Sequence, residues 1–169
     1  MKFIHILLIT VALALATPVQ ARDAVVVRFV DAQVHADAGQ APWDADANRA
    51  ALARHLQDLG RRHLAASETL TIDVRDVDLA GTVIPFARRL PDVRVTHGRA
   101  DWPRVEMRYT LTRDGKVLLQ GDEVVVDLDY QRPIRGPLRH VDLAAEKRML
   151  TQWFDERFGS GRALTATRP

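Results

Sequence analysis

Three aspartates, Asp73, Asp76 and Asp78, stand at the end of a segment that has the alternating pattern of a β-strand. Carboxylate oxygens are the ligands that Ca²⁺ and Mg²⁺ prefer, so one hypothesis is a cation site that supports metal-assisted hydrolysis. The residues from Asp76 onward do not match a calcium-binding loop, because Ala80 and Ala87 occupy its fifth and twelfth positions. We favour the other hypothesis, in which the aspartates accept main-chain hydrogen bonds in a turn or pair with Arg75, Arg88 or Arg89.

A second group of candidate residues is basic. Three arginines and a histidine lie within nine residues of one another, beside two prolines and a glycine: Arg132, Arg135, Arg139 and His140. Guanidinium groups bind phosphates and carboxylates through paired hydrogen bonds. The segment therefore predicts binding of an anionic envelope component, such as a lipopolysaccharide phosphate or a peptidoglycan carboxylate. The alternative, which we consider the commoner arrangement, is a solvated connection whose arginines pair with nearby aspartates, Asp127, Asp129 and Asp142.

Other catalytic chemistry has little support in the residue types. The chain has no cysteine, and Ser67 and Ser160 do not lie in a nucleophile elbow. The histidines show no paired metal-ligand spacing, and the sequence contains no glycine-rich phosphate loop. Glu106 and Glu123 could form a carboxylate pair for glycoside hydrolysis, but carboxylates on a hairpin more often pair with arginines. We therefore expect no catalytic residues and no cofactor, and we interpret the protein as a non-enzymatic binding or envelope-associated domain.

The first 21 residues have the features of a secretory signal peptide. Lys2 supplies a positive charge, residues 3–16 form an apolar run, and Ala21 is a small residue at the cleavage position. The apolar run is shorter than the roughly 20 residues that a membrane-spanning helix needs, and Pro18 follows it. We therefore expect cleavage after Ala21 and a mature periplasmic protein without a transmembrane span.

Net charge does not indicate a nucleic-acid partner. The chain has a formal net charge of +2, and loss of Lys2 with the signal peptide leaves 23 basic and 22 acidic side chains. Export would also separate the protein from the chromosome. Without disulfides, a hydrophobic core must stabilise the mature chain, which is long enough for one domain.

The elements that must position these residues begin with a strand, a helix and a second strand. Residues 24–30 are a β-branched run typical of a buried strand. Leucines then recur at helical spacing as far as Leu64, with Asp44 or Asp46 as the helix cap. Residues 70–74 alternate apolar and polar side chains. This order predicts a crossover connection between two parallel strands, with their adjacency left open.

The second half of the chain predicts a short strand near residues 93–96, a hairpin and a final helix. In the hairpin, residues 105–111 alternate in polarity, and Asp114-Gly115 supplies the positive φ values of a tight turn. The final helix is capped by Asp142, and its apolar side chains are Leu143, Met149, Leu150, Trp153, Phe154 and Phe158.

Two strands change the parity of their apolar residues, which predicts a bulge in each. If the second strand continued in register, Asp78 would share the buried face with Leu70, where an unpaired carboxylate is costly. On the return strand of the hairpin, Val117 has one parity and Val124 the other, so we expect a bulge near Gly121.

Together these elements predict an α+β fold, in which a mixed, mostly antiparallel sheet of four or five strands carries two amphipathic helices on one face. The expected domain organisation is a signal peptide at residues 1–21, a single α+β domain at residues 22–160 and a C-terminal tail at residues 161–169.

Several segments resemble a family of exported bacterial proteins, domain of unknown function 3016. The resemblance rests on Val25-Val26-Val27-Arg28-Phe29, Asp31-Ala32, Asp76-Val77-Asp78-Leu79-Ala80-Gly81, Asp127-Leu128-Asp129-Tyr130, Glu146-Lys147-Arg148-Met149-Leu150 and Trp153-Phe154. It spans nearly all of the mature chain and supports the expected fold and export. The family has no assigned activity, substrate or cofactor, so the resemblance implies none here.

Overall fold

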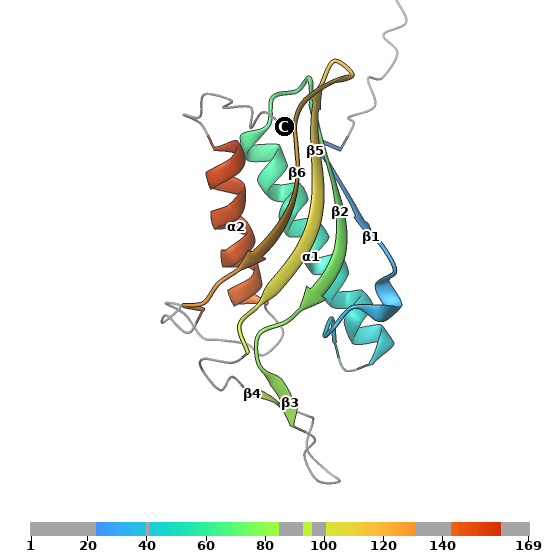
Figure 1. The fold of residues 1–169 in the computed structure, drawn as a ribbon, viewed down its shortest axis with the longest axis vertical. Helices are drawn as coiled ribbons and strands as arrows, with labels where there is room; N and C mark the ends of the chain where they lie inside the picture. Colours follow the sequence, from blue (N-terminus) through green and yellow to red (C-terminus); the bar gives the residue numbers. More distant parts are fainter. Residues whose placement is uncertain (1–22, 40, 85–92, 96–100, 131–142, 160–169) are drawn as a thin grey trace, which may run out of the picture.

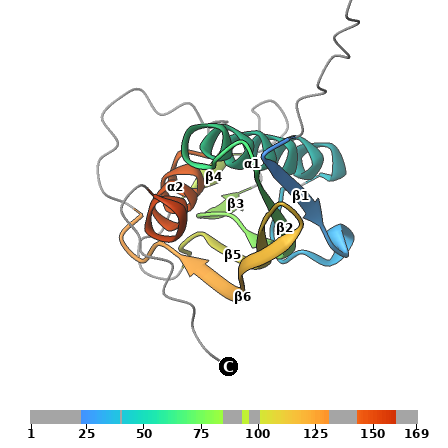
Figure 2. The same cartoon turned by 90° about the horizontal axis from the view of Figure 1, so that it is seen from above.

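A computed structural model describes residues 23–39, 41–84, 93–95, 101–130 and 143–159. Four strands form a mixed sheet in the order β1-β2-β5-β6, and two helices cover one of its faces (Figures 1 and 2). This confirms the predicted α+β class. The elements are β1 (Val25–Phe29), the short 3₁₀ helix η1 (Ala32–Val34), α1 (Pro42–His63), β2 (Glu68–Asp78), β3 (Thr82–Ile84), β4 (Val93–Val95), β5 (Arg104–Arg113), β6 (Lys116–Val126) and α2 (Ala144–Phe158).

The first half forms the predicted crossover unit. β1 and β2 are parallel and adjacent, with Val25 opposite Leu70 and Phe29 opposite Val74. Between them α1 runs back across the sheet. It passes so close to β1 that a Cβ on Gly60 would lie 2.1 Å from Cγ2 of Val25. Gly60 therefore allows the helix to rest on the strand.

The start of each helix differs from the prediction. Neither Asp44 nor Asp46 caps α1, which begins at Pro42 after Ala41 and has no side-chain cap bond. Proline suits the first helical position because it lacks the N–H that would be unpaired there. The other predicted cap, Asp142, lies outside the described residues, and α2 begins after Leu143, whose φ is 44°.

The predicted hairpin is confirmed. β5 and β6 are antiparallel neighbours, and Asp114 and Gly115 at the turn have φ values of 51° and 78°. The predicted short strand is also present as β4, but it pairs with β3 in a separate two-stranded sheet. The main sheet therefore has four strands in the part of the chain that the structure describes.

The two predicted bulges have different outcomes. The pairing of β2 with β5 shifts between Val74 and Asp76, which confirms the bend before Asp76. The shift in β6 lies opposite Leu111 and Thr112 and places the extra residue at Leu118. The prediction of a bulge near Gly121 is therefore wrong.

Because this second bulge lies at Leu118, residues 121–126 of β6 turn the opposite sides to the core from those predicted. Glu123 and Val125 point toward the helices, whereas Val124 and Val126 are 53% and 41% exposed on the other face. Contacts with the core explain the reversal. A Cβ on Gly121 would lie 3.0 Å from Tyr109 Oη, so Gly121 leaves room for this side chain, and the Glu123 carboxylate accepts hydrogen bonds from Tyr109 and Trp153.

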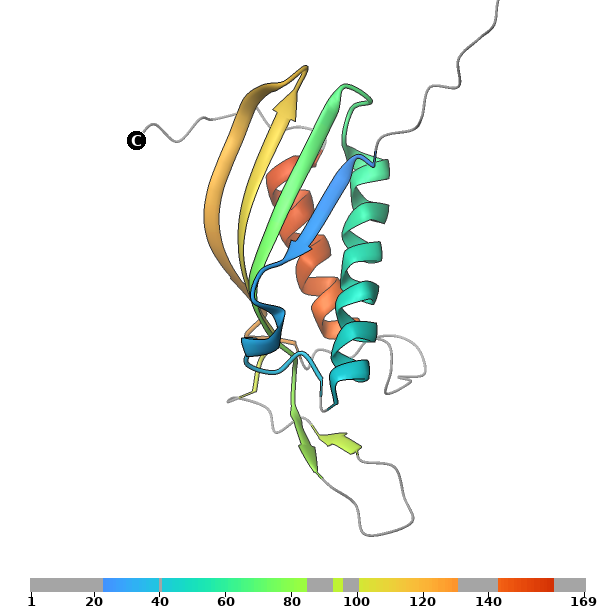
Figure 3. The ribbon, with the colours of Figure 1, turned by 90° about the vertical axis from the view of Figure 1, so that its right-hand side faces the viewer.

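The core lies between the sheet and the helices. Leu52, Leu56 and Leu59 of α1 and Met149, Leu150, Trp153 and Phe154 of α2 are buried against Leu70, Ile72, Val74, Met107, Tyr109 and Leu111 of the sheet. No described element covers the other face of the sheet (Figure 3), where arginines alternate with carboxylates and threonine. None of the described helices combines the length and apolar character needed to cross a membrane.

Candidate functional site

Three segments that carry the family resemblance meet where β2 and β6 end and β5 begins (Figure 1). The register places Arg104 between Asp78 on β2 and Val126 on β6, and β6 leads directly to Asp127. At the start of α2, Glu146 accepts a hydrogen bond from the main-chain N–H of Ala80 at 2.8 Å. Residues 76–81, 127–130 and 146–150 therefore form one region, here called the converging end.

Two of the three aspartates proposed for cation binding, Asp73 and Asp76, lie beside arginines. Asp76 accepts hydrogen bonds from the N–H of Ala36 at 2.8 Å and from Arg104 at 2.7 Å. Asp73 lies on the other side of the bulge, 3.6 Å from Arg28. The structure thus brings Asp76 and Asp78 to the converging end and leaves Asp73 with β1.

Asp78 lies beside a carboxylate that the sequence analysis did not select, Asp37. Burial raises the pKa of Asp78, and the negative charges of Asp37 and Asp76 raise it further. Main-chain hydrogen bonds from Asp37 to Val77 and from Leu79 to Asp37 hold Asp37 beside β2. Spacing alone could not reveal this contact, because about forty residues separate Asp37 from Asp78.

Arg94 fixes Asp37 in place. Its Nη2 contacts both carboxylate oxygens of Asp37, at 3.0 and 2.9 Å. Its Nη1 donates to the carbonyl oxygens of Leu79, Ala80 and Gly81, the last at 2.7 Å. One arginine on β4 therefore ties the loop before α1 to the end of β2. Among the described residues, no group of three or more His, Cys, Asp or Glu side chains is arranged to hold a metal ion.

A second arginine clamp closes the other side of the converging end. Arg148 donates to Oδ2 of Asp127 at 2.8 Å and to the carbonyl oxygen of Tyr130 at 2.8 Å. Tyr130 is buried, and its hydroxyl donates to Asp101, whose carbonyl oxygen accepts from the N–H of Gly81 at 3.0 Å. The predicted binding residues Arg132, Arg135, Arg139 and His140 lie outside the described residues. Their segment leaves the described fold after Tyr130 and rejoins it at Leu143.

The two hairpin glutamates do not face each other. Glu106 lies on the open face of the sheet and pairs with Arg104 at 2.9 Å, whereas Glu123 points toward the helices. Glu123 accepts from Tyr109 Oη at 3.1 Å and Trp153 Nε1 at 2.7 Å, and pairs with Arg157 at 2.9 Å. The favoured expectation, pairing with arginines, is confirmed, and the carboxylate-pair alternative is wrong because the two side chains lie on opposite faces.

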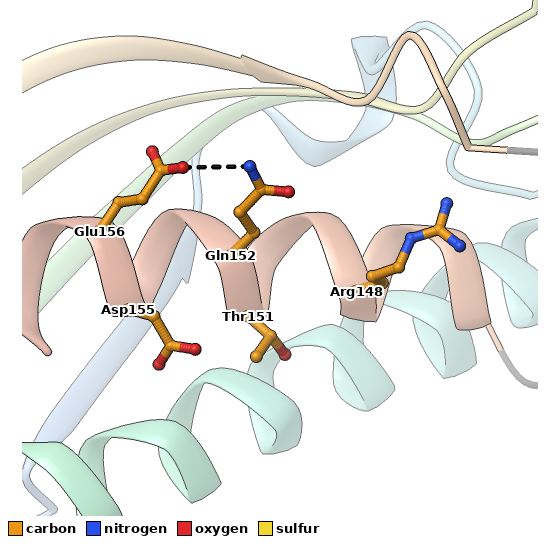
Figure 4. A pocket seen from close by; sticks show the side chains of 5 residues that line it. All are labelled: Arg148, Thr151, Gln152, Asp155 and Glu156. Carbon is orange, nitrogen blue, oxygen red and sulfur yellow. Dashed lines mark hydrogen bonds between the residues drawn. The ribbon is translucent and has the colours of Figure 1, made fainter. Parts of the chain in front are cut away.

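The solvent side of α2 carries a shallow hollow (Figure 4). Its lining residues are Arg148, Thr151, Gln152, Asp155 and Glu156. Gln152 donates to Glu156 at 3.0 Å on the side of the helix nearer β6, while Thr151 and Asp155 point toward α1 (Figure 4). A groove next to it, between β6 and α2, includes Val124 and Gln152.

Across the α1–α2 interface, His55 binds the first turn of α2. Its Nε2 lies 2.9 Å from the carbonyl oxygen of Lys147 and 2.9 Å from Oγ1 of Thr151. Because Thr151 Oγ1 also donates to that carbonyl, the three groups form a local network. Burial lowers the pKa of His55 below its ordinary value of 6.5.

Comparison with known families confirms the resemblance seen in the sequence. Residues 23–156 match the family described as "Protein of unknown function (DUF3016)". Comparison with curated proteins and with solved structures gave no match. The match covers β1 through most of α2, including all three segments of the converging end. The chain therefore belongs to the DUF3016 family.

Proposed function

We propose that the mature chain is a non-enzymatic binding domain of the bacterial periplasm, which holds an anionic component of the cell envelope through Arg132, Arg135, Arg139 and His140. Export follows from the signal-peptide features of residues 1–21. The ligand class follows from guanidinium chemistry, since arginine is suited to paired hydrogen bonds with phosphates and carboxylates.

The observation that carries the proposal is the pairing of Asp127 with Arg148. Asp127 is one of the carboxylates that could otherwise neutralise the arginine segment, and Arg148 already holds it with bonds of 2.8 and 3.2 Å. Arg148 also binds the carbonyl oxygen of Tyr130, the last described residue before the segment. Arg148 therefore holds the residue that precedes the segment and also occupies a competing carboxylate.

The partners of the other carboxylates support a non-enzymatic role. Asp37 and Asp76 each bind an arginine, and Glu146 accepts from a main-chain N–H. General acid–base or metal chemistry needs carboxylates that can change protonation state or accept a ligand. These three carboxylates instead join separate segments of the fold.

Co-sedimentation with bacterial envelope fractions tests the proposal. We expect the mature protein to sediment with the envelope, and we expect added salt and Arg135→Glu to release it. The matched control is Arg54→Glu, which makes the same charge change at an exposed position of α1. Binding that is indifferent to salt, or equally weakened by both substitutions, would contradict a site in the arginine segment.

A further inference from the structure

We infer that two copies of this chain associate edge to edge through β6, about a two-fold axis that passes beside Val124. β6 is the last strand of the four-stranded sheet, and no described strand pairs with its outer edge. An unpaired strand edge presents a row of N–H and C=O groups that can pair with another strand. This inference is independent of the arginine segment.

The hydrogen-bond pattern between β5 and β6 identifies the main-chain groups on the free edge of β6. Asp127 donates its N–H to the carbonyl oxygen of Pro103, so the backbone of Asp127 faces β5. Residues of an antiparallel strand alternate between bonding inward to one neighbour and outward to the other. Because no bulge interrupts this part of β6, Val124 and Val126 direct their N–H and C=O groups toward the free edge.

The side chains of this stretch also favour pairing. Natural edge strands are commonly protected by lysine, proline or shortness. β6 has eleven residues. Between Asp122 and Asp127, the side chains that lie on the face away from the helices are Val124 and Val126. The opposite edge strand, β1, has only five residues, and its exposed positions include Arg28. Of the two edge strands that the structure describes, β6 is therefore the longer, and its stretch from Val124 to Val126 has neither lysine nor proline.

A row of side chains on α2 matches an antiparallel copy of itself. Arg148, Gln152 and Glu156 follow one another at intervals of four residues, and Gln152 and Glu156 lie on the side of α2 nearer β6 (Figure 4). A two-fold axis beside Gln152 would set Arg148 of one copy opposite Glu156 of the other. Among the described residues, Glu156 has no cationic partner, and the Arg148 side chain is one-third exposed while it holds Asp127. Both ends of the row thus gain an opposite charge from the second copy.

The two parts of the proposed interface agree in position. Val124 and Gln152 line the same groove between β6 and α2, so one axis can pass beside both residues. Adjacent strands are about 4.8 Å apart and packed helices are roughly 10 Å apart, so each helix covers about two strands. α1 lies over the β1 side of the sheet and α2 over the β6 side (Figure 2). A second sheet joined at β6 would place its α2 at about one helix spacing from the first.

A second copy explains these features better than a foreign strand does. Any extended peptide could pair with the backbone of β6, but a peptide offers no helix to meet the row on α2. Only an antiparallel copy of α2 presents an acidic group to Arg148 and a basic group to Glu156 at once. The edge of β6 and the row of side chains on α2 therefore both indicate a second copy of this chain as the partner.

Sedimentation velocity of the mature protein over a range of concentrations tests the inference. We expect a reversible dimer, and we expect Val124→Lys to make the protein monomeric while its far-ultraviolet circular dichroism stays unchanged. The control is Val26→Lys, which places the same charge on the edge strand at the other side of the sheet, where Val26 is 36% exposed. A wild-type monomer at every concentration, or equal dissociation by both substitutions, would overturn the inference.

A cysteine cross-link tests the position of the axis. The chain has no cysteine, so Val124→Cys can form a disulfide only with another molecule. In a hydrogen-bonded antiparallel pair the two Cα atoms are about 5.5 Å apart, within the range of a disulfide. We expect mild oxidation to cross-link Val124→Cys and to leave Val26→Cys monomeric. Glu156→Arg should weaken the dimer by placing two cations opposite each other. A foreign partner strand would instead leave purified Val124→Cys unlinked, which would refute the dimer.

Discussion

Arg94 and Arg104 form ion pairs with the aspartates at and beside the converging end. Arg104 holds Asp76, and Arg94 holds Asp37 beside Asp78. The choice between a cation site and ion pairs was visible in the sequence, but the arginine partners were not. Arg75 pairs with Asp122 instead, and Arg88 and Arg89 lie outside the described residues. It depends on which residues the register and the β3–β4 pair bring together, and such long-range pairing leaves no local pattern.

Added Ca²⁺ or Mg²⁺ should not raise the melting temperature of the mature protein. A cation that bound only the folded state would stabilise it by mass action, but Asp76 and Asp37 already have arginine partners. Differential scanning calorimetry with and without each cation measures the effect. A rise of several degrees that disappears in Asp76→Ala or Asp78→Ala would instead support the metal site.

Replacement of Glu123 by alanine should destabilise the fold strongly. The change removes the acceptor of Trp153 Nε1 and the carboxylate to which Tyr109 Oη donates, and an unsatisfied buried donor such as the indole N–H costs about 1–3 kcal/mol. We therefore expect a loss of about 2–4 kcal/mol in the free energy of unfolding, measured by urea titration. Arg54→Ala, at an exposed position of α1, should change stability by less than about 0.5 kcal/mol. Similar losses in the two variants would show that the Glu123 contacts contribute little.

At the scale of elements, local patterns predicted where the strands and helices lie in the sequence better than which side chains of β6 face the core. The turn at Asp114-Gly115 and the bend before Asp76 follow from turn chemistry and from the cost of a buried carboxylate. The bulge in β6 was misplaced because Val124 and Val126 suggested an inward face. Tyr109 and Trp153 instead draw Glu123 inward, and these aromatic partners come from β5 and α2.

The close contact between α1 and β1 predicts an unusual response to Gly60→Ala. Alanine normally stabilises a helix interior by about 1 kcal/mol relative to glycine. Here the new methyl group would lie 2.1 Å from Cγ2 of Val25, so we expect destabilisation. Because Val25→Ala would remove the clashing atom, the double variant should be more stable than the sum of the two single effects predicts. Additive effects in urea titrations would indicate that the helix and strand separate freely.

The α1–α2 interface should lose stability as the pH falls below about 6.5. Burial lowers the pKa of His55 in the folded state, and the positive charges of Lys147 and Arg62 lower it further, while the main-chain bond to Lys147 and the charge of Asp58 oppose the shift. The unfolded chain therefore takes up a proton on this side chain at higher pH than the folded chain does, which favours unfolding in acid. This contribution is fully present above the unfolded pKa and decreases through the interval below it.

Urea titrations between pH 7.5 and pH 5 can isolate that contribution. Since His55 is only half-buried, we expect it to amount to less than about 1 kcal/mol. His55→Gln keeps a hydrogen-bond donor for the Lys147 carbonyl and cannot titrate, so its stability should depend less on pH than that of the wild type. Parallel pH profiles for the two proteins would assign the dependence to other groups.

At the scale of the whole molecule, the sequence predicted the two-layer arrangement because its causes are local. Amphipathic helices and half-apolar strands must bury their apolar sides together. The pairing of β3 with β4 apart from the main sheet was not predicted, since short strands carry little pattern. The alternating polarity of residues 105–111 predicted one polar face of the sheet, and the arginines and carboxylates on the open face agree with it.

The position of β1 allows a final prediction about processing. Val25 is fully buried and begins the sheet only four residues after Ala21. Cleavage after Ala21 would therefore remove the signal peptide and leave every core side chain that the structure describes. We expect protein recovered from the periplasm to begin at Arg22, as measured by intact mass spectrometry. A chain of residues 22–160 should then unfold cooperatively at the same temperature as the mature protein, because α2 ends before residue 160. Native protein that retains residues 1–21 in the cytosol would contradict export, whereas a lower melting temperature for residues 22–160 would show that the C-terminal tail contributes to the fold.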